Sequence, residues 1–145
     1  MRMLEQLKPL SLLMLRFGLG LIFVFHGYPM LFTDARHTAQ FFAQIGMPFP
    51  MSYVVGTIEF FGGALLIAGL FTRVAALLLV GVMAGAIWKV HLAKGILAVG
   101  EYEHALIVGL AAFVLATTGP GAISLDRAIF GEAAGPKMKP GRTKD

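Results

Sequence analysis

Four long stretches of the sequence are almost free of charged residues, and they constrain the fold more than any other feature. Leu10–Phe32 holds 23 residues with one charge, Tyr53–Phe71 holds 19 with one, and the two shorter stretches hold none. A helix needs about 20 mainly apolar residues to cross a bilayer. The shorter stretches reach that length when flanking residues join them. We therefore expect an all-α, antiparallel bundle of four transmembrane helices within residues 1–130, with spans of about 10–32, 53–71, 74–92 and 101–118.

The overall composition supports a membrane protein. Hydrophobic residues make up 57% of the 145 residues and charged residues only 14%, against about 25% charged residues in soluble domains. So few charges would leave large apolar patches on a water-facing surface, and this hydrophobicity also excludes disorder of the whole chain. The chain has no Cys, which excludes disulfides and thiolate metal ligands. The first apolar stretch is too long for a cleaved signal peptide.

The distribution of Lys and Arg predicts the orientation. With four spans both termini lie on one side, and that side carries eight Lys and Arg residues against three on the other. We expect a multi-pass protein of the inner (plasma) membrane. The positive-inside rule then places both of its termini in the cytoplasm. Residues 131–145 are rich in Gly, Pro and Lys. We expect them to form a disordered basic cytoplasmic tail that is attracted to anionic lipid rather than to nucleic acid.

Two short helices are expected outside the bundle. Residues 34–45 alternate apolar and polar side chains at helical spacing, which predicts a short amphipathic external helix that lies in the interface or covers the bundle. Gly119-Pro120-Gly121 ends the fourth span, and Ser124 can then cap a short C-terminal interfacial helix.

Small residues at helical spacing predict close helix packing. The spacing Gly81-x-x-x-Gly85 is typical of a face that lets a neighbouring helix approach closely. Glycines on the first two spans have the same property. The predicted helix-packing residues are Gly20, Gly62, Gly63, Gly81 and Gly85. Such faces favour a homo-oligomer or a complex with partner membrane subunits.

Arg16 and Glu59 are the charged residues that lie well inside predicted spans, away from the span ends. A charge near the bilayer centre costs at least about 2.5 kcal/mol and normally faces the protein interior with a partner. We expect Arg16 and Glu59 to contact each other, directly or through water. In the alternative, Arg16 extends to cytoplasmic water and Glu59 is a neutral, hydrogen-bonded acid.

Most other ionisable groups gather at the external side, which predicts a polar pocket open to the outside. The candidate ligand-binding or proton-relay residues are Arg16, His26, Glu59, His91 and His104. No metal site is expected, because Glu101-x-x-His104 supplies only half of a di-iron signature. A haem bound by two histidines, His26 with His91 or His104, is a weaker alternative.

The same residues and several short motifs resemble the DoxX family of small membrane proteins. The resemblance covers roughly Leu12 to Arg127 and depends on the order of its motifs rather than on any one of them. These are Arg16 followed by Gly18, Phe25-His26-Gly27, Gly46-Met47-Pro48, Glu59 before Gly62-Gly63, Gly69-Leu70-Phe71-Thr72-Arg73, His91, and Gly119-Pro120-Gly121 with Ser124-Leu125-Asp126. The resemblance implies a four-helix membrane protein associated with thiosulfate:quinone oxidoreductase or with redox-stress complexes.

Three functions remain open at this stage. The first is a membrane subunit associated with quinone-linked or stress-related redox complexes, with a quinone as the one candidate cofactor. The second is a non-enzymatic membrane scaffold or assembly subunit, and the third is a small-solute transporter. No sequence motif assigns a reaction, so whether the chain is itself an enzyme stays open, and thiosulfate oxidation has no Cys to support it.

Overall fold

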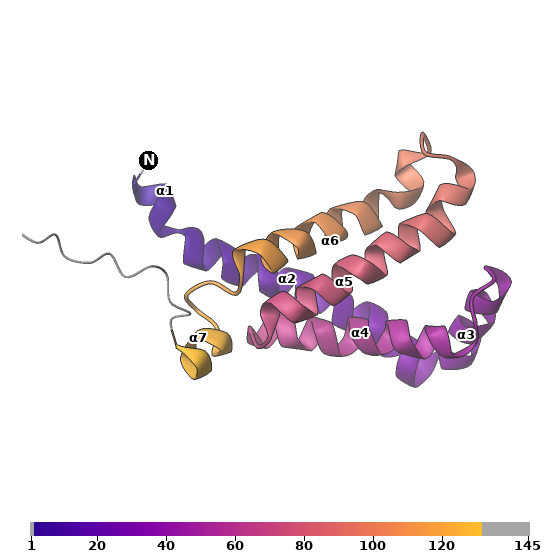
Figure 1. Ribbon diagram of the computed structural model, residues 1–145, viewed down its shortest axis with the longest axis horizontal. Coiled ribbons are helices and arrows are strands. Elements are labelled where there is room, and N and C mark those ends of the chain that lie inside the picture. Colours follow the sequence, from indigo (N-terminus) through magenta and orange to yellow (C-terminus); the bar gives the residue numbers. More distant parts are fainter. Residues whose placement is uncertain (1, 132–145) are drawn as a thin grey trace, which may run out of the picture.

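The computed structural model describes residues 2–131, and all regular secondary structure in that range is helical. Four helices are long enough and apolar enough to cross a membrane, as predicted (Figure 1). Their bounds are α2 Lys8–Tyr28, α4 Pro50–Ala68, α5 Thr72–Ala86 and α6 Val99–Thr118. The predicted tail of residues 131–145 lies, apart from Gly131, outside the described residues.

Short π-helical segments extend two of the spans. The segment η1, Pro29–Thr33, continues α2, and the segment η2, Ile87–His91, continues α5. With these extensions the first span has 26 residues and the third has 19. A π-helical turn inserts an extra residue into the helical repeat and is frequent near functional sites. Both segments lie at the same end of the bundle.

The predicted short helices are present. The helix expected between the first two spans is α3, Ala35–Gln44, and it packs with Ala39 and Phe42 buried. The C-terminal helix is α7, Leu125–Phe130, and its N-cap residue Ser124 accepts a hydrogen bond from the backbone N–H of Arg127. A five-residue helix, α1 Arg2–Gln6, and a 3-10 turn, η3 Leu92–Lys94, complete the described elements.

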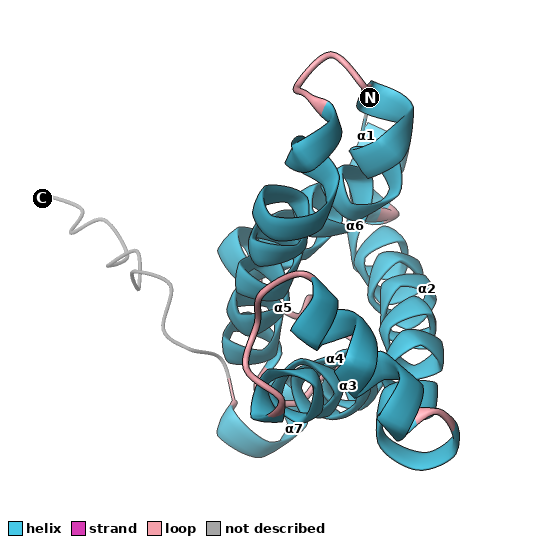
Figure 2. Cartoon of the chain, turned by 90° about the vertical axis from the view of Figure 1, so that its right-hand side faces the viewer, coloured by secondary structure: helices cyan, strands magenta, loops and turns pink. Residues whose placement is uncertain are grey.

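The long helices form two closely packed pairs. Helix α2 packs mainly on α4, and α5 packs mainly on α6. Helix α4 also packs on α5, whereas α2 has little contact with α6. Figure 2 shows the same helices from the right-hand side of Figure 1, with α3 towards the viewer. We call the end with α1 and α7 the terminal end, and the end with α3 and residues 87–98 the loop end (Figure 1). The shared core contains Leu19, Phe23, Leu66, Leu79, Val108, Ala112 and Leu115.

Glycines bring α2 and α4 into backbone contact. A Cβ placed on Gly63 would lie 2.6 Å from the carbonyl oxygen of Gly20, and a Cβ on Gly20 would meet Gly63 in the same way. Gly62 faces α5 instead, where a Cβ would lie 3.3 Å from the Leu79 side chain. In contrast, a Cβ on Gly81 or Gly85 would meet nothing within 4 Å. Among residues 2–131, therefore, nothing packs closely against the Gly81 and Gly85 face of α5.

Candidate functional site

Arg16 connects three segments by hydrogen bonds at the terminal end. Its side chain is only 1% exposed. Its Nε donates a hydrogen bond of 2.8 Å to the carbonyl oxygen of Leu66, and its Nη1 donates to the carbonyl oxygen of Pro120. The last carbonyls of a helix have no partner within the helix. Arg16 therefore adds a donor at Leu66 near the end of α4, where the Gly69 N–H also donates, and at Pro120 just after α6.

A direct contact between Arg16 and Glu59 is not formed. Arg16 binds the α4 helix at Leu66, which lies seven residues beyond Glu59 and so about 10 Å further along that helix. The charged group that interacts electrostatically with Arg16 is Asp126. The Arg16 guanidinium thus donates its hydrogen bonds to backbone carbonyl oxygens at the terminal end, and its role there is structural.

Asp126 caps the start of α5 from a distant part of the chain. Its two carboxylate oxygens accept hydrogen bonds from the backbone N–H groups of Phe71 and Thr72, at 2.6 and 2.9 Å. The backbone N–H of Asp126 in turn donates to the carbonyl oxygen of Gly69. A negative group at a helix N-terminus satisfies free N–H groups and interacts favourably with the helix dipole. Asp126 therefore fixes α7 to the turn between α4 and α5.

The same turn requires Gly69. Its φ of 70° is in the left-handed region, and a Cβ there would lie 2.7 Å from the Arg16 guanidinium carbon. Arg73, just beyond, donates from Nη1 to the carbonyl oxygens of Ala116 and Thr117 at the end of α6. Much of the motif around residues 69–73 and 119–126 is thus explained by this hydrogen-bonded network at the terminal end, and not by a ligand.

Glu59 occupies a different position, near the middle of the membrane. It lies nine residues after Pro50, the first residue of α4, and so about 14 Å from the loop end. Its side chain is 6% exposed. The group that interacts electrostatically with it is His26, and no hydrogen bond joins its carboxyl group to another described residue. Glu59 is therefore a largely buried acid without a hydrogen-bond partner in the part of the chain that the structure describes.

His26 and His104 connect Glu59 with the loop end. Their rings stack with centroids 5.6 Å apart and an angle of 26° between the ring planes. The Nδ1 of His26 donates to the Ile22 carbonyl oxygen at 2.8 Å, so Nε2 is the free nitrogen and an acceptor in the neutral ring. Both histidines are exposed on the surface of the bundle. His26 of α2 thus interacts with Glu59 of α4 and with His104 of α6.

Other polar residues at the loop end are not seen to join this group. The side chain of His91 lies outside what the structure describes. Glu101 pairs with Lys94 at 2.8 Å, and Glu103 is exposed. In the described part of the chain no cluster of three or more acidic or histidine side chains has the arrangement of a metal site. The candidate site therefore consists of Glu59, His26 and His104.

Sequence reasoning missed the roles of Asp126 and Arg73. In the sequence, Asp126 stands out only as part of the motif Ser124-Leu125-Asp126, and Arg73 only as the last residue of the motif that begins at Gly69. The signal that was available is weak: Ser124-Leu125-Asp126 follows a Gly-Pro-Gly break, as a helix start does. Nothing in it indicates that the carboxylate would cap a helix 54 residues earlier in the sequence.

Comparison with known proteins now identifies the family. The DoxX family pattern matches residues 11–92. The chain belongs to the DoxX family. The matched region runs from the start of the first span to η3, and it includes Arg16, His26 and Glu59. His104 and Asp126 lie outside it.

Relatives agree with this assignment over most of their length. The chain is 37% identical over 118 residues to "Putative oxidoreductase CatD" of Bacillus subtilis, covering 81% of this chain and 86% of CatD. It is 35% identical over 130 residues to the inner membrane protein YphA of Escherichia coli, covering 83% and 91% of the two chains. The inner membrane protein YqjF of the same organism is 28% identical over 127 residues, covering 86% and 96%. No solved structure matches the chain significantly. The protein is thus a multi-pass inner membrane protein.

Proposed function

We propose that the protein is a small membrane subunit of a redox complex and that it binds a quinone beside Glu59, His26 and His104. The observation that carries this proposal is the free carboxyl group of Glu59, buried near mid-membrane next to His26. An ionisable residue inside a membrane is costly and marks a functional site by default. The name of CatD, which refers to an oxidoreductase, supports redox chemistry.

The chemistry of these side chains fits a quinone. A quinone headgroup presents two carbonyl oxygens that accept hydrogen bonds, and a quinol presents two hydroxyl groups that donate them. A protonated Glu59 can donate to a carbonyl oxygen, and the free Nε2 of His26 can accept from a hydroxyl. Reduction of a quinone to a quinol consumes two electrons and two protons. A partner redox subunit supplies the electrons, and this chain supplies the protons.

The positions of the three residues suit proton transfer towards the loop end. His104 lies five residues into α6, about 8 Å from the loop end, and Glu59 lies about 14 Å from it. His26 interacts with both. General acid–base groups within reach of one another exchange protons efficiently. Glu59 therefore holds the proton next to the substrate, and the two histidines exchange it with water.

The exposed imidazoles also support a partner. His26 and His104 are exposed at a depth where lipid chains would surround them, and polar side chains at this depth normally face protein or water. A partner membrane subunit or a second copy of this chain would cover them. The excess of Lys and Arg at the terminal end supports an orientation with both termini in the cytoplasm.

Calorimetry with nanodiscs tests this function. Short-chain menaquinone and ubiquinone analogues are titrated into the protein in two buffers of different ionisation enthalpy, which reports both affinity and proton exchange. Glu59→Leu should weaken binding about tenfold, whereas Glu59→Gln should keep most affinity and lose the proton exchange. Glu103→Gln, an exposed acid on α6, is the matched control and should change neither. Absence of binding by both analogues to the wild-type protein would refute the proposal.

A further inference from the structure

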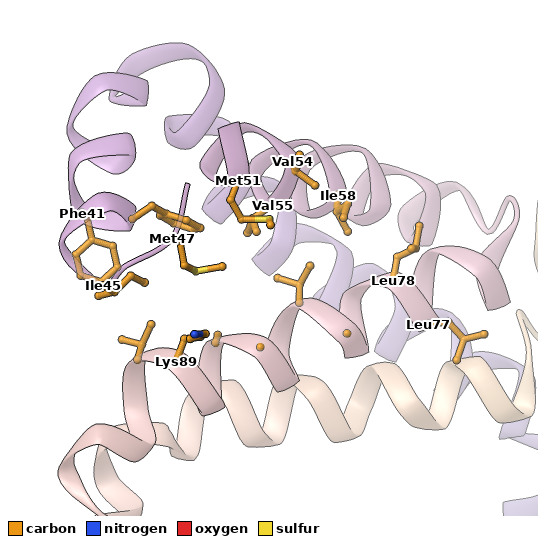
Figure 3. Close-up of a pocket in the computed structure, with 16 residues that line it drawn as sticks. Phe41, Ile45, Met47, Met51, Val54, Val55, Ile58, Leu77, Leu78 and Lys89 are labelled. Carbon is orange, nitrogen blue, oxygen red and sulfur yellow. The ribbon is translucent and has the colours of Figure 1, made fainter. Parts of the chain in front are cut away.

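A second feature of the bundle lies on another face of α4. A groove of about 640 Å³ runs between α4 and α5, and α3 covers one end of it (Figure 3). The side chains of α4 that line it are apolar, and they include Val54 and Ile58. Glu59, His26 and His104 are not among the lining residues. The groove is therefore separate from the candidate quinone site.

The depth of the groove comes from two glycines. Gly81 and Gly85 line it, and a Cβ on either would meet nothing within 4 Å. Larger residues at these positions would fill the space between the two helices. Figure 3 shows α4 side chains on one side of the groove and α5 on the other. In a membrane, an apolar groove that is open on the side of the bundle faces lipid chains.

The length of the groove matches one leaflet of a bilayer. Along α5 and η2 it runs from Leu77 to Val90, which is 13 residues or about 20 Å. Half of the hydrocarbon core is about 15 Å thick. The groove therefore extends from the loop end to about the bilayer centre, as one acyl chain of a lipid in that leaflet does.

A positive charge marks the loop end of the groove. Lys89 is the one charged residue that lines it, and its Nζ lies 5.0 Å from the centre of the Trp88 ring. Lys89 has no carboxylate partner among the described residues, where the two ion pairs are Lys94–Glu101 and His37–Asp34. Lys and Trp side chains are typical of the headgroup level. A phosphate there would find an unpaired cation.

We propose that this groove binds an anionic phospholipid from the leaflet at the loop end. One acyl chain lies along Gly81 and Gly85, and the phosphate contacts Lys89. Helix α3 lies over the headgroup end, with Phe41 and Ile45 lining the groove. A helix of a second copy, about 10 Å wide, fits less well beneath this cover than a single acyl chain does. This inference does not depend on quinone binding.

Native mass spectrometry of the full chain tests the lipid site. The protein is released from nanodiscs that contain equal amounts of phosphatidylglycerol and phosphatidylethanolamine, and retained lipid and oligomeric state are read together. The wild-type protein should retain phosphatidylglycerol selectively. Lys89→Gln should reduce that selectivity about fivefold, and Gly81→Leu with Gly85→Leu should reduce retention of both lipids about tenfold.

Matched variants separate the groove from general effects. Gly18→Leu adds the same side chain at another helical glycine with no neighbour within 4 Å, and Lys94→Gln removes a loop-end charge outside the groove. Both should retain lipid as the wild type does. Equal retention of the two lipids by the wild type, or unchanged retention in the double glycine variant, would overturn the proposal. Loss of a dimer in that variant, with lipid unchanged, would instead assign the groove to a second copy.

Discussion

Arg16 and Leu66 lie 50 positions apart in the sequence, yet the Nε of Arg16 donates a 2.8 Å hydrogen bond to the Leu66 carbonyl oxygen inside the bundle. The same guanidinium reaches Pro120, which follows α6. One side chain of α2 thereby holds the ends of two other helices. This contact explains why a charge is retained inside the first span without an acidic partner on the neighbouring helix.

Replacing Arg16 should therefore destabilise the bundle. Arg16→Met removes the side-chain donor from the carbonyl oxygens of Leu66 and Pro120, and only that of Leu66 keeps another donor, the Gly69 N–H. An unsatisfied acceptor costs about 1–3 kcal/mol, so we expect a loss in that range. Thermal unfolding in detergent should show a lower midpoint. Arg36→Met, at an exposed position on α3, is the control and should change stability by less than about 0.5 kcal/mol. An unchanged midpoint for Arg16→Met would show that these hydrogen bonds contribute nothing net.

The Asp126 cap gives a second test of the terminal end. Asp126→Ala removes both acceptors from the first N–H groups of α5 and should cost about 2 kcal/mol, whereas Asp126→Asn keeps one acceptor and should cost about 1 kcal/mol. The readout is urea unfolding of the protein in mild detergent micelles.

A control for this cap is available within the chain. Asp34 stands at the N-cap of α3 but makes no capping hydrogen bond with its side chain. Its ion pair with His37 is 3.6 Å long and exposed, and such pairs contribute little. Asp34→Ala should therefore leave stability almost unchanged. Equal effects at the two positions would contradict the cap at Asp126.

The contact of α2 with α4 predicts a strong dependence on residue size at position 63. A Cβ on Gly63 would lie 2.6 Å from the Gly20 carbonyl oxygen, so Gly63→Ala must push the helices apart. We expect a cost of about 1–3 kcal/mol, as for other overpacked cores. Gly18→Ala, on the open face of α2, should be neutral or slightly stabilising, because Ala is the better helix former. Similar unfolding midpoints for the two variants would argue against close packing.

Much of the fold was predictable because the signal is local. The apolar stretches, Gly119-Pro120-Gly121 and Ser124 each specify a helix or its end from neighbouring residues alone, and the structure places four spans and the two expected short helices there. The cost of a charge in lipid likewise identified Arg16 and Glu59 as unusual.

The partners of those charges were not predictable in the same way. Arg16 binds backbone carbonyls, which every sequence carries and which no residue type marks. Asp126 caps a helix that is brought to it by the tertiary fold. The spacing of Gly81 and Gly85 predicts an approachable face, but whether a helix of the same chain covers it depends on how the pairs of helices are joined.

The stacking of His26 on His104 predicts that α2 and α6 can be cross-linked near the loop end. The chain has no Cys, so His26→Cys with His104→Cys introduces the only thiols. With ring centroids 5.6 Å apart, a short bifunctional thiol reagent should join the two positions within one chain and shift the mobility of the protein on a denaturing gel. His26→Cys with Ile107→Cys, further along α6, is the control and should react much less. Equal cross-linking of the two pairs would contradict the contact.

The charge distribution predicts the orientation, which reporter fusions can measure. Eight Lys and Arg residues lie at the terminal end or in the sequence beyond it, against three at the loop end, and positively charged segments stay in the cytoplasm. Green fluorescent protein fused after Phe130 should therefore fluoresce, and alkaline phosphatase inserted at Gly95, in the turn before α6, should be active. The reverse fusions should be dark and inactive. The opposite pattern would place the His26 and His104 imidazoles on the cytoplasmic side, and protons for Glu59 would then be exchanged with the cytoplasm.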